Sequence, residues 1–575
     1  MKSLRVALAQ INSTVGDFEG NGQKIIKFIE VAKERDADVV VFPELAVTGY
    51  PPEDLVLRSD FINANLKTLK LIAESAVGIA VVVGYIEKDR QVYNSAAFIY
   101  DGRIYGTYRK IFLPNYGVFD EKRYFSPGTE VPVFDFGGVT LGINICEDIW
   151  YPDGPAVMQT AAGAGIILNL NASPYQTEKW KAREKMISTR AADNASYVVY
   201  VNLVGGQDEL LFEGGSLIFD PVGTLIARGK FFEEDLIISD LEIEKPFRAR
   251  LHDLRLRERI SICRDNPPVK RISVYYESRR LKKPLDAEAP VVSGPERAEE
   301  IYRALVLGVK DYFGKNNFHN AVIGISGGVD SALVASVAAD ALGAENVMGL
   351  FMPSRYTSKE SREDAEELAK NLGFKLTEIS IEGLFEKYID LLAPFFKDLP
   401  ADNTEQNIQA RIRGNLLMAY SNKFGGLVLT TGNKSEMAVG YATLYGDMAG
   451  GFAVLKDIEK MTVYELARYR NSVKPAIPER ILKKAPTAEL KENQKDSDNL
   501  PPYEVLDPIL KALIEEDRDL SEIIDMGFDA STVEQVAKMV QVSEYKRRQA
   551  PPGIKITQRA FGRDRRIPIT NKFRA

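Results

Sequence analysis

The chain has 575 residues, of which 45% are hydrophobic and 27% are charged, and it carries a net charge of −7. This length exceeds what one hydrophobic core supports and predicts two to four domains. The negative charge argues against a general nucleic-acid-binding protein. No apolar run approaches the roughly 18 residues of a membrane span, and SLRVALAQINS after Met1 reads as a strand, so we expect a cytoplasmic protein without membrane contact.

The rarest residue types narrow the chemistry. Cys146 and Cys263 are the two cysteines, too few for a disulfide framework or a four-thiolate zinc site, which predicts a reducing compartment. His252 and His319 are the two histidines, so a Ser-His-Asp triad or a histidine-rich metal site has little material. Any nucleophilic chemistry is therefore expected to take its base from another residue type.

Residues 1–245 alternate short apolar runs with helical patterns. LRVALAQI, DVVVFPE, LGINIC and GIILNLN are rich in Val and Ile and are typical of buried strands. NGQKIIKFIEVAKERDA and YPDGPAVMQTAAGAG follow helical patterns, so the alternation predicts an α/β domain. Residues 246–290 are crowded with Arg and Lys and read as a connector at a domain boundary.

A second α/β region covers residues 291–575. HNAVIGIS, ENVMGLFMPS, FKLTEIS and GGLVLTTGN read as strands, each followed by a helix or a loop. ESREDAEELAKNLG predicts a helix that stops at Gly373. This succession predicts a doubly wound parallel sheet. The polar residues 485–500 read as a mobile loop.

The motif SGGVDS, residues 326–331, lies between an apolar strand and an Ala-rich helix. Gly327 and Gly328 lack a Cβ, so backbone N–H groups can close around an oxyanion, and the helix N-terminus adds positive potential. Ser326 and Ser331 can add hydroxyl donors. Asp330 would repel a bound phosphate, so its presence in this loop indicates a Mg²⁺ ion between the carboxylate and the phosphate. The alternative is a glycine-rich turn with a serine cap, which the flanking strand and helix disfavour.

The loop lacks the GKS or GKT of a Walker A motif. It resembles the pyrophosphate loop of the ATP pyrophosphatase superfamily. The resemblance implies a Rossmann-like domain that cleaves ATP, as a co-substrate, between the α and β phosphates and forms acyl or related adenylates.

Three residues of the N-terminal half lie at or near the ends of apolar runs. Glu44 ends DVVVFPE, Cys146 ends LGINIC, and Lys110 lies in YRKIFLPNYGVFDE. Groups at strand ends can converge on one pocket, where Glu44 could act as the base for the thiol and Lys110 could stabilise the thiolate and the oxyanion. Taken singly, a lone cysteine is more often a buried small hydrophobe, the glutamate a loop residue and the lysine a surface charge.

Together with the flanks FPEL, YRKIFLPNY, ICEDIW and NASPY, these residues resemble the nitrilase superfamily. The resemblance implies an αββα sandwich with Glu44, Lys110 and Cys146 as its catalytic triad. The positions that match glutamine-binding residues of its glutamine-hydrolysing members are Tyr116, Glu121, Glu147, Ser173 and Lys179. Glu121 is the match to the auxiliary glutamate of the family, and Lys179 would hold the amino-acid carboxylate as a point charge.

A nitrilase-type amidase followed by this loop resembles the glutamine-dependent NAD+ synthetases over essentially the whole chain. Segments 352–358, 404–418, 430–466 and 501–510 continue the resemblance through the second half. It implies ATP binding by Ser326, Gly327, Gly328, Val329, Asp330, Ser331, Met352 and Thr431. It implies deamido-NAD+ binding by Asn407, Arg411, Glu436, Tyr445, Asp447 and Lys460, with Asp330 and Glu436 coordinating Mg²⁺. From the residues alone, Arg411 reads as a helix-surface charge and Glu436 as an acid near a turn.

The resemblance implies a reaction in two stages. Glutamine forms a thioester at Cys146 and releases ammonia, and water then frees glutamate. The nicotinate carboxylate of deamido-NAD+ attacks the α-phosphate of ATP, and ammonia, conducted through an internal channel, displaces AMP to form NAD+. Mg²⁺ offsets the repulsion between two anionic substrates. A homo-oligomer is expected, and residues 485–500 resemble a loop that closes over ATP.

Several alternatives stay open. The loop does not distinguish deamido-NAD+ from other carboxylates that are activated as adenylates. A degenerate amidase that serves as a binding module, and a nucleic-acid-modifying enzyme that uses the same loop, are further readings, although the chain lacks a CxxC pair. The basic run 546–568 reads as a solvated tail, a nucleic-acid contact, or a phosphate-facing or subunit-contact segment, and the last of these is favoured.

Overall fold

The computed structural model describes residues 3–254, 256, 258, 269–276, 285, 289–397, 399–492 and 494–573. Cys263 and part of the expected connector at 246–290 lie outside the described residues. The chain forms two compact units, one of residues 1–207 and 211–295 and one of residues 208–210 and 296–575. In the described part of the chain, no helix is both long enough and apolar enough to cross a membrane.

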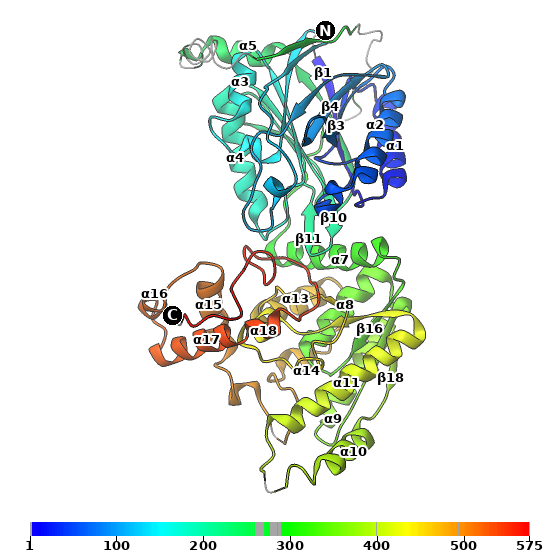
Figure 1. The fold of residues 1–575 in the computed structure, drawn as a ribbon, viewed down its shortest axis with the longest axis vertical. Helices are drawn as coiled ribbons and strands as arrows, with labels where there is room; N and C mark the ends of the chain where they lie inside the picture. The colour runs from blue at the N-terminus through cyan, green and yellow to red at the C-terminus, as the bar shows by residue number, and fades with distance from the viewer. Residues whose placement is uncertain are drawn as a thin grey trace. The chain divides into compact units, whose positions relative to one another are not determined.

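The first unit contains two sheets with helices on their outer faces (Figure 1). One sheet has the order β14-β1-β2-β3-β4-β5, with bounds Asp235–Glu242, Ser3–Gln10, Val39–Val41, Ala80–Lys88, Val92–Tyr100 and Arg103–Arg109. The other has the order β13-β12-β9-β8-β7-β6-β15, with bounds Leu225–Arg228, Leu217–Phe219, Tyr197–Asn202, Ile166–Asn171, Val139–Ile145, Val133–Phe136 and Arg271–Ser273. A hairpin of β10 (Val204–Gln207) and β11 (Leu210–Glu213) stands apart from both sheets.

Alternate side chains of the central strands enter different cores, which makes the unit four layers deep. Val39 and Val41 of β2 enter the core between the two sheets, while Val40 packs toward α1 (Phe18–Glu34) and α2 (Ser59–Ser75). Leu168 of β8 also enters the inner core, while Ile167 lies in the core under α4 (Lys179–Asn194), on the side of the unit that also carries α3 (Pro155–Ala161). The predicted αββα sandwich is confirmed.

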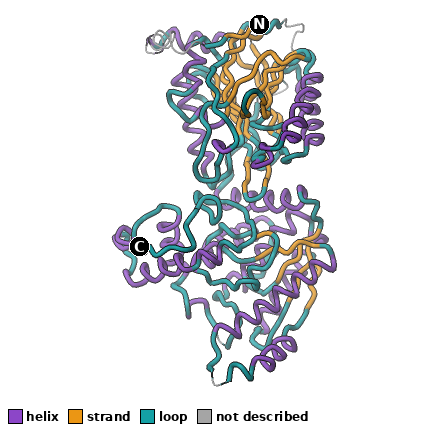
Figure 2. The backbone as a smooth tube through the Cα atoms, viewed as in Figure 1, coloured by secondary structure: helices purple, strands orange, loops and turns teal. Residues whose placement is uncertain are grey.

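The second unit is built on a five-stranded sheet in which every neighbouring pair is parallel. Figure 2 shows its strands in orange among purple helices. Its order is β18-β17-β16-β19-β20, with bounds Lys375–Glu378, Val347–Phe351, Asn320–Gly324, Gly426–Thr430 and Phe452–Ala453. Helices α10 (Glu382–Leu392) and α11 (Asn403–Phe424) share a core with this sheet. Helices α7 (Arg297–Lys315), α8 (Val329–Leu342) and α13 (Lys460–Val473) pack together against the other face. The predicted doubly wound sheet is confirmed.

Two further features complete the second unit. Helix α9 (Lys359–Leu372) ends at Gly373, whose φ of 85° supplies the left-handed cap, so the predicted stop is confirmed. Helices α12 (Lys434–Val439), α15 (Tyr503–Ile514), α16 (Leu520–Asp525) and α17 (Ala530–Val542) share a separate apolar core. Helix α12 thereby gains a rigid support at the carboxyl end of the sheet.

Candidate active sites

Cys146 stands at a sharp turn between β7 and a short 3-10 helix, Cys146–Ile149. Its φ of 44° lies in the left-handed region, which is strained for a residue with a side chain. The side chain is buried, with 5% of the residue exposed. Since β7 and β8 run parallel in direct register, the segment that follows β8 at Ala172 reaches the same edge of the sheet as Cys146.

A buried hydrogen-bond network surrounds Lys110. Lys110 Nζ lies 2.7 Å from Glu44 Oε1 and 2.8 Å from Glu121 Oε1. Asn94 Nδ2 donates to Glu44 Oε1 at 2.7 Å, and the Ala172 backbone N–H donates to Glu44 Oε2 at 3.0 Å. The structure therefore brings Glu44, Lys110 and Glu121 together around one ammonium group, as charge-assisted bonds that orient all three side chains.

Burial and charge set the protonation states around the thiol. Burial raises the pKa of Cys146 well above its ordinary value, and the charge of Glu44 adds to this rise while Lys110 opposes it. Burial alone would lower the pKa of Lys110, but Glu121 and Glu44 raise it well above its ordinary value. Burial raises the pKa of Glu121 to about 7 against the opposing charge of Lys110. The site thus holds a neutral thiol beside a charged ammonium.

Asp148 ties the cysteine turn to the segment that follows Lys110. Its Oδ1 accepts from the backbone N–H groups of Ile111 and Phe112 at 3.2 and 2.9 Å. Its Oδ2 accepts from the Tyr108 hydroxyl at 2.7 Å and the Ile145 N–H at 3.1 Å. Burial raises the pKa of Asp148 to about 6 against these donors. Sequence reasoning missed this residue, although its place two positions after the cysteine was visible in ICED.

The other predicted glutamine-binding residues surround this turn. The Tyr116 hydroxyl donates to both carboxylate oxygens of Glu147, at 3.0 and 2.9 Å, and Tyr116 is 59% exposed. The backbone N–H of Ser173, in the segment after β8, donates to Asn202 Oδ1 at 3.0 Å. Lys179 opens helix α4. The structure thus offers an exposed tyrosine–carboxylate pair that includes the residue next to Cys146, and a buried serine in the segment that follows β8.

In the second unit, SGGVDS forms the turn between β16 and α8. Gly327 has a φ of 79°, and a Cβ there would stand 2.4 Å from the Ser361 carbonyl oxygen, so only glycine fits without movement. The Ser326 and Ser331 hydroxyls lie 3.1 Å apart, and Ser331 Oγ donates to the Gly328 carbonyl at 3.0 Å. Ser331 is buried and braces the loop from behind, whereas Ser326 faces the cavity described next.

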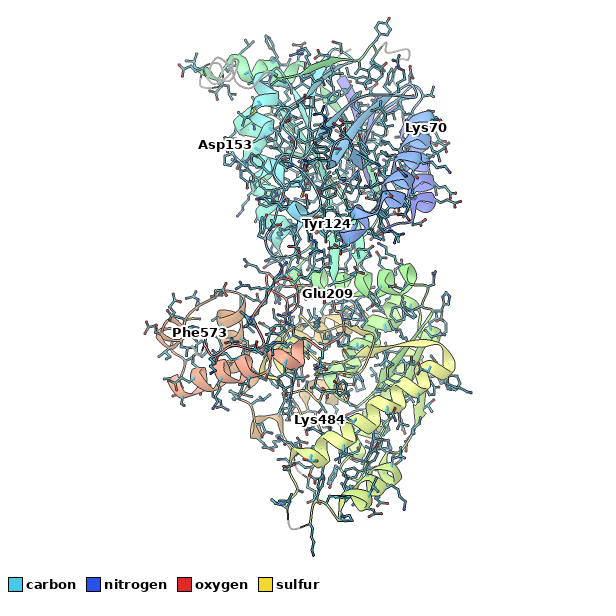
Figure 3. The ribbon with its side chains drawn as sticks, viewed as in Figure 1. Lys70, Tyr124, Asp153, Glu209, Lys484 and Phe573 are labelled. Carbon is cyan, nitrogen blue, oxygen red and sulfur yellow. The ribbon has the colours of Figure 1, made fainter. Side chains whose placement is uncertain are left out.

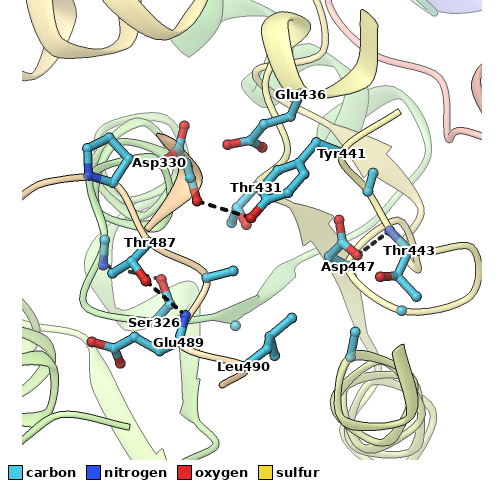
Figure 4. Close-up of a pocket in the computed structure, with 18 of the residues that line it drawn as sticks. Ser326, Asp330, Thr431, Glu436, Tyr441, Thr443, Asp447, Thr487, Glu489 and Leu490 are labelled. Atoms are coloured by element: carbon cyan, nitrogen blue, oxygen red, sulfur yellow. Dashed lines mark hydrogen bonds between the residues drawn. The ribbon is translucent and has the colours of Figure 1, made fainter. Parts of the chain in front are cut away.

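A cavity of about 620 Å³ opens beside this loop (Figure 4). The predicted residues that line it are Ser326, Gly327, Gly328, Val329, Asp330, Met352, Asn407, Thr431, Glu436, Asp447 and Lys460. Arg411 and Tyr445 do not line it. They line a separate hollow together with Leu384 and Tyr388, where Arg411 Nε donates to the Leu444 carbonyl at 3.2 Å.

Lys460 joins the two acids that were expected to bind metal. Its Nζ lies 2.5 Å from Asp330 Oδ2 and 3.3 Å from Glu436 Oε1. Burial raises the pKa of Glu436 to about 8, and the charge of Lys460 opposes this rise. Among the described residues, no group of three or more His, Cys, Asp or Glu side chains could hold a metal ion. Two carboxylates facing a phosphate loop still suit Mg²⁺, which takes one or two carboxylates and completes its shell with phosphate oxygens and water.

Two cavity residues outside the predicted set come from distant parts of the chain. Lys546 lines the cavity and donates to the Gly440 and Ala442 carbonyls at 2.7 and 2.9 Å. Lys484, labelled in Figure 3, lines it as well and lies 2.9 Å from Glu489 Oε1. The basic run 546–568 was the available signal for Lys546.

The rest of that basic run is largely tied into the second unit. Arg547 and Arg565 both pair with Glu544, at 2.9 and 3.1 Å, and Lys555 pairs with Asp564 at 2.6 Å. These three cations form ion pairs with neighbouring carboxylates. Lys546 lines the cavity.

Two family models cover most of the chain. A carbon-nitrogen hydrolase model matches residues 5–245, and an NAD synthase model matches residues 301–550. The chain is 52% identical to a glutamine-dependent NAD(+) synthetase of Thermotoga maritima over the full length of both proteins. It is 49% identical to a protein of the same name from Aquifex aeolicus, over 99% of this chain and all of the relative.

A solved structure agrees with these relatives. The glutamine-dependent NAD+ synthetase of Acinetobacter baumannii, solved in complex with adenosine diphosphate, is 42% identical to the chain. The two structures match with a TM-score of 0.75 over 99% of each chain. The likeness thus spans both units and both sites, and the chain belongs to the family of glutamine-dependent NAD(+) synthetases.

Proposed function

We propose that the chain synthesises NAD+ from deamido-NAD+, with glutamine as the nitrogen donor and ATP as the source of energy. The observation that carries the proposal is the full-length likeness to proteins named for this activity. The chemistry of the two sites supports it, because one offers a thiol beside a carboxylate and an ammonium, and the other offers a glycine-rich loop beside paired carboxylates.

The first unit hydrolyses glutamine in this proposal. Cys146 attacks the side-chain amide, Glu44 takes the thiol proton and delivers it to the leaving ammonia, and Lys110 stabilises the oxyanion of the tetrahedral intermediate. The raised pKa of the thiol keeps it neutral until a substrate amide is in place. Glu121 gives Lys110 a second carboxylate contact and so helps to hold it in position.

The surrounding polar groups bind the amino and carboxylate groups of glutamine in this proposal. Tyr116 and Glu147 form a pair that suits an ammonium group, and Lys179 suits a carboxylate. Ser173 adds a hydroxyl beside the thiol. Ammonia leaves as the thioester forms, and water then hydrolyses the thioester to free glutamate and the Cys146 thiol. An internal channel would conduct the ammonia to the second site.

The second unit activates the nicotinate carboxylate. Backbone N–H groups of the loop at 326–331 and the N-terminus of α8 bind the ATP phosphates, in keeping with the diphosphate nucleotide bound by the Acinetobacter baumannii relative. Asp330 and Glu436 would hold Mg²⁺, which supplies charge neutralisation at the phosphates when bound. Lys460 positions both acids and offers a cation to the developing pyrophosphate. Met352 and Thr431 line the same cavity and complete the proposed ATP-binding set.

Deamido-NAD+ would occupy the same cavity through Asn407, Asp447 and the acids around Lys460. Gly414 and Ala449 line both this cavity and the hollow that contains Arg411 and Tyr445. A long dinucleotide could therefore extend from one to the other, which supports Arg411 and Tyr445 as contacts of the same substrate.

Replacement of Cys146 by Ala tests the proposal. The variant is expected to lose glutamine-supported NAD+ synthesis and to keep ammonia-supported synthesis, since the second site remains intact. Cys263→Ser is the matched control, because it removes the other thiol and should leave both activities in place. Glutamine-supported synthesis by the Cys146→Ala variant would refute the assignment of the nucleophile.

The alternative is an amidotransferase of the same architecture that acts on another carboxylate. Both readings predict pyrophosphate release from ATP, so the acceptor decides between them. Pyrophosphate release should be measured with glutamine and a panel of carboxylates that includes deamido-NAD+. Release with another carboxylate and none with deamido-NAD+ would favour the alternative.

We also propose the domain bounds 1–245, 246–290 and 291–575, for the amidase, the connector and the synthetase, and a homo-oligomeric assembly. Exposed apolar side chains near α10 support the oligomer: Leu384, Tyr388, Leu391 and Phe395 are 47%, 48%, 70% and 77% exposed. Light scattering coupled to size-exclusion chromatography tests it, and a mass of 64.0 kDa for the main species would contradict it.

A further inference from the structure

The segment 172–178 between β8 and α4 carries Ser173 and leads directly into Lys179. Three backbone N–H groups fix this segment. The N–H of Ala172 donates to Glu44 Oε2 at 3.0 Å, the N–H of Ser173 donates to Asn202 Oδ1 at 3.0 Å, and the N–H of Tyr175 donates to the Leu211 carbonyl at 2.7 Å. The position of Ser173 and Lys179 is therefore set by the strands and the carboxylate to which this segment is bound.

A buried ion pair holds the far end of the same segment. Arg183 lies one helical turn after Lys179 on α4, and its Nη2 lies 2.5 Å from Glu213 Oε1 at the end of β11. Each residue is 1% exposed. Since the Leu211 carbonyl that binds Tyr175 belongs to the same strand, β11 holds both the segment and the helix that follows it.

Stability alone does not account for this pair. Within the described part of the structure, Arg183 Nε and Glu213 Oε2 have no hydrogen-bond partner although both atoms are buried. Desolvating two charges for one direct contact is costly, and well-packed apolar residues commonly replace such pairs without loss of stability. A buried pair that is only partly satisfied indicates a requirement for orientation.

The pair also lies close to the reacting group. The Arg183 guanidinium carbon is 5.8 Å from the centre of the Tyr200 ring. The Tyr200 side chain in turn lies near Ser173. Arg183 lies near enough to Cys146 for its charge to act on the thiol. The pair thus lies close to Tyr200 and within electrostatic range of Cys146.

We propose that Arg183 and Glu213 are positioning residues that hold the segment 172–179 where Ser173 and Lys179 can bind the amino-acid end of glutamine. The pair acts through the segment and does not itself touch the substrate. The inference rests on the proposed glutaminase function. Loss of the Arg183–Glu213 pair should raise the KM for glutamine and leave Cys146, Glu44 and Lys110 in place.

Three variants test the role, namely Arg183→Met, Arg183→Lys and the double variant Arg183→Met with Glu213→Met. The single Met variant leaves an unpaired buried carboxylate and is expected to be unstable. The double variant removes both charges at similar volume, so it should melt near the wild-type temperature while its KM for glutamine stays raised by about tenfold or more with kcat little changed. Arg183→Lys should recover part of the affinity because it restores the charge without the planar fork.

Two further measurements separate this inference from the proposed function. Ammonia-supported NAD+ synthesis should be unchanged in Arg183→Lys and in the double variant, and its absence in the wild type would instead defeat the proposed function. Alkylation of Cys146 by iodoacetamide, followed at the peptide level so that Cys263 is scored separately, should proceed at the wild-type rate. A double variant with wild-type KM would overturn the inference, and so would a loss of alkylation larger than the loss of glutamine affinity.

Discussion

Asp148 offers the sharpest test of how the first site is assembled. Its carboxylate accepts four hydrogen bonds, two on each oxygen. Asparagine at this position has one oxygen and one amide group, which can only donate. The less costly orientation keeps the oxygen toward Ile111 and Phe112, lets the Tyr108 hydroxyl turn to accept, and leaves the Ile145 N–H without an acceptor.

The magnitude follows from that count. One lost bond to a charged acceptor costs about 1.5–3 kcal/mol. The Ile145 N–H immediately precedes Cys146, whose φ of 44° depends on this anchoring. We therefore expect Asp148→Asn to fold with reduced stability and to let the cysteine turn relax. A displacement of about 1 Å at a reacting group can reduce the rate about 10²-fold.

The assay compares glutamine-supported with ammonia-supported NAD+ formation in the same preparation. Asp148→Asn should lose glutamine-supported turnover by about 10²-fold and keep the ammonia-supported rate. Tyr108→Phe is the matched control, because it removes one of the four bonds and leaves all three backbone donors satisfied. Wild-type turnover with glutamine in Asp148→Asn, or an equal loss in Tyr108→Phe, would refute the reasoning.

Three other outcomes are expected. Gly327→Ala should reduce NAD+ synthesis with either nitrogen donor by about tenfold or more, because a Cβ would stand 2.4 Å from the Ser361 carbonyl oxygen and φ is 79°. Gly314→Ala is the control and should be tolerated, because a Cβ at this position inside a helix would have nothing within 4 Å. Burial raises the pKa of Glu121 from 4.5 to about 7, so the folded protein holds a proton there that the unfolded chain releases. Stability should therefore fall as pH rises from about 4.5 to about 7. The melting temperature of Glu121→Gln should change less with pH over this range than that of the wild type, and equal changes in the two proteins would contradict this assignment. Lys546→Met should raise the KM for deamido-NAD+ about tenfold, because it removes a cation from the cavity. Glutamine hydrolysis measured without ATP is the control. An unchanged KM would exclude a contact between Lys546 and the substrate.

Local sequence patterns predicted the regular parts of the fold well. The Val-rich and Ile-rich runs became central strands because they are buried on both faces, and Gly373 ended its helix because it adopts a left-handed conformation. Strand β15 was not predicted. Arg271–Ser273 lies in a basic stretch, and its strand forms only by pairing with β6, more than a hundred residues earlier.

The candidate sites depend on tertiary contacts that local sequence patterns do not encode. The convergence of Glu44, Lys110 and Cys146 depends on three separate strand ends, which spacing alone does not encode and which the resemblance supplied. Asp148 was missed because its burial and its donors are tertiary features. Arg411 follows Asn407 by one turn of α11 yet lines a different hollow, because the boundary between the two hollows passes between these residues.

The way Glu44 is bound has a consequence for the chemical lifetime of the protein. Glu44 accepts from Lys110 and Asn94 on one oxygen and from Ala172 on the other, so the proposed base has hydrogen-bond partners on both oxygens before any substrate binds. The thiol beside it stays protonated, and protonated thiols react slowly with peroxides and other oxidants. Under the proposed mechanism, the arrangement that delays proton transfer until glutamine arrives would also protect Cys146 from oxidative damage between turnovers.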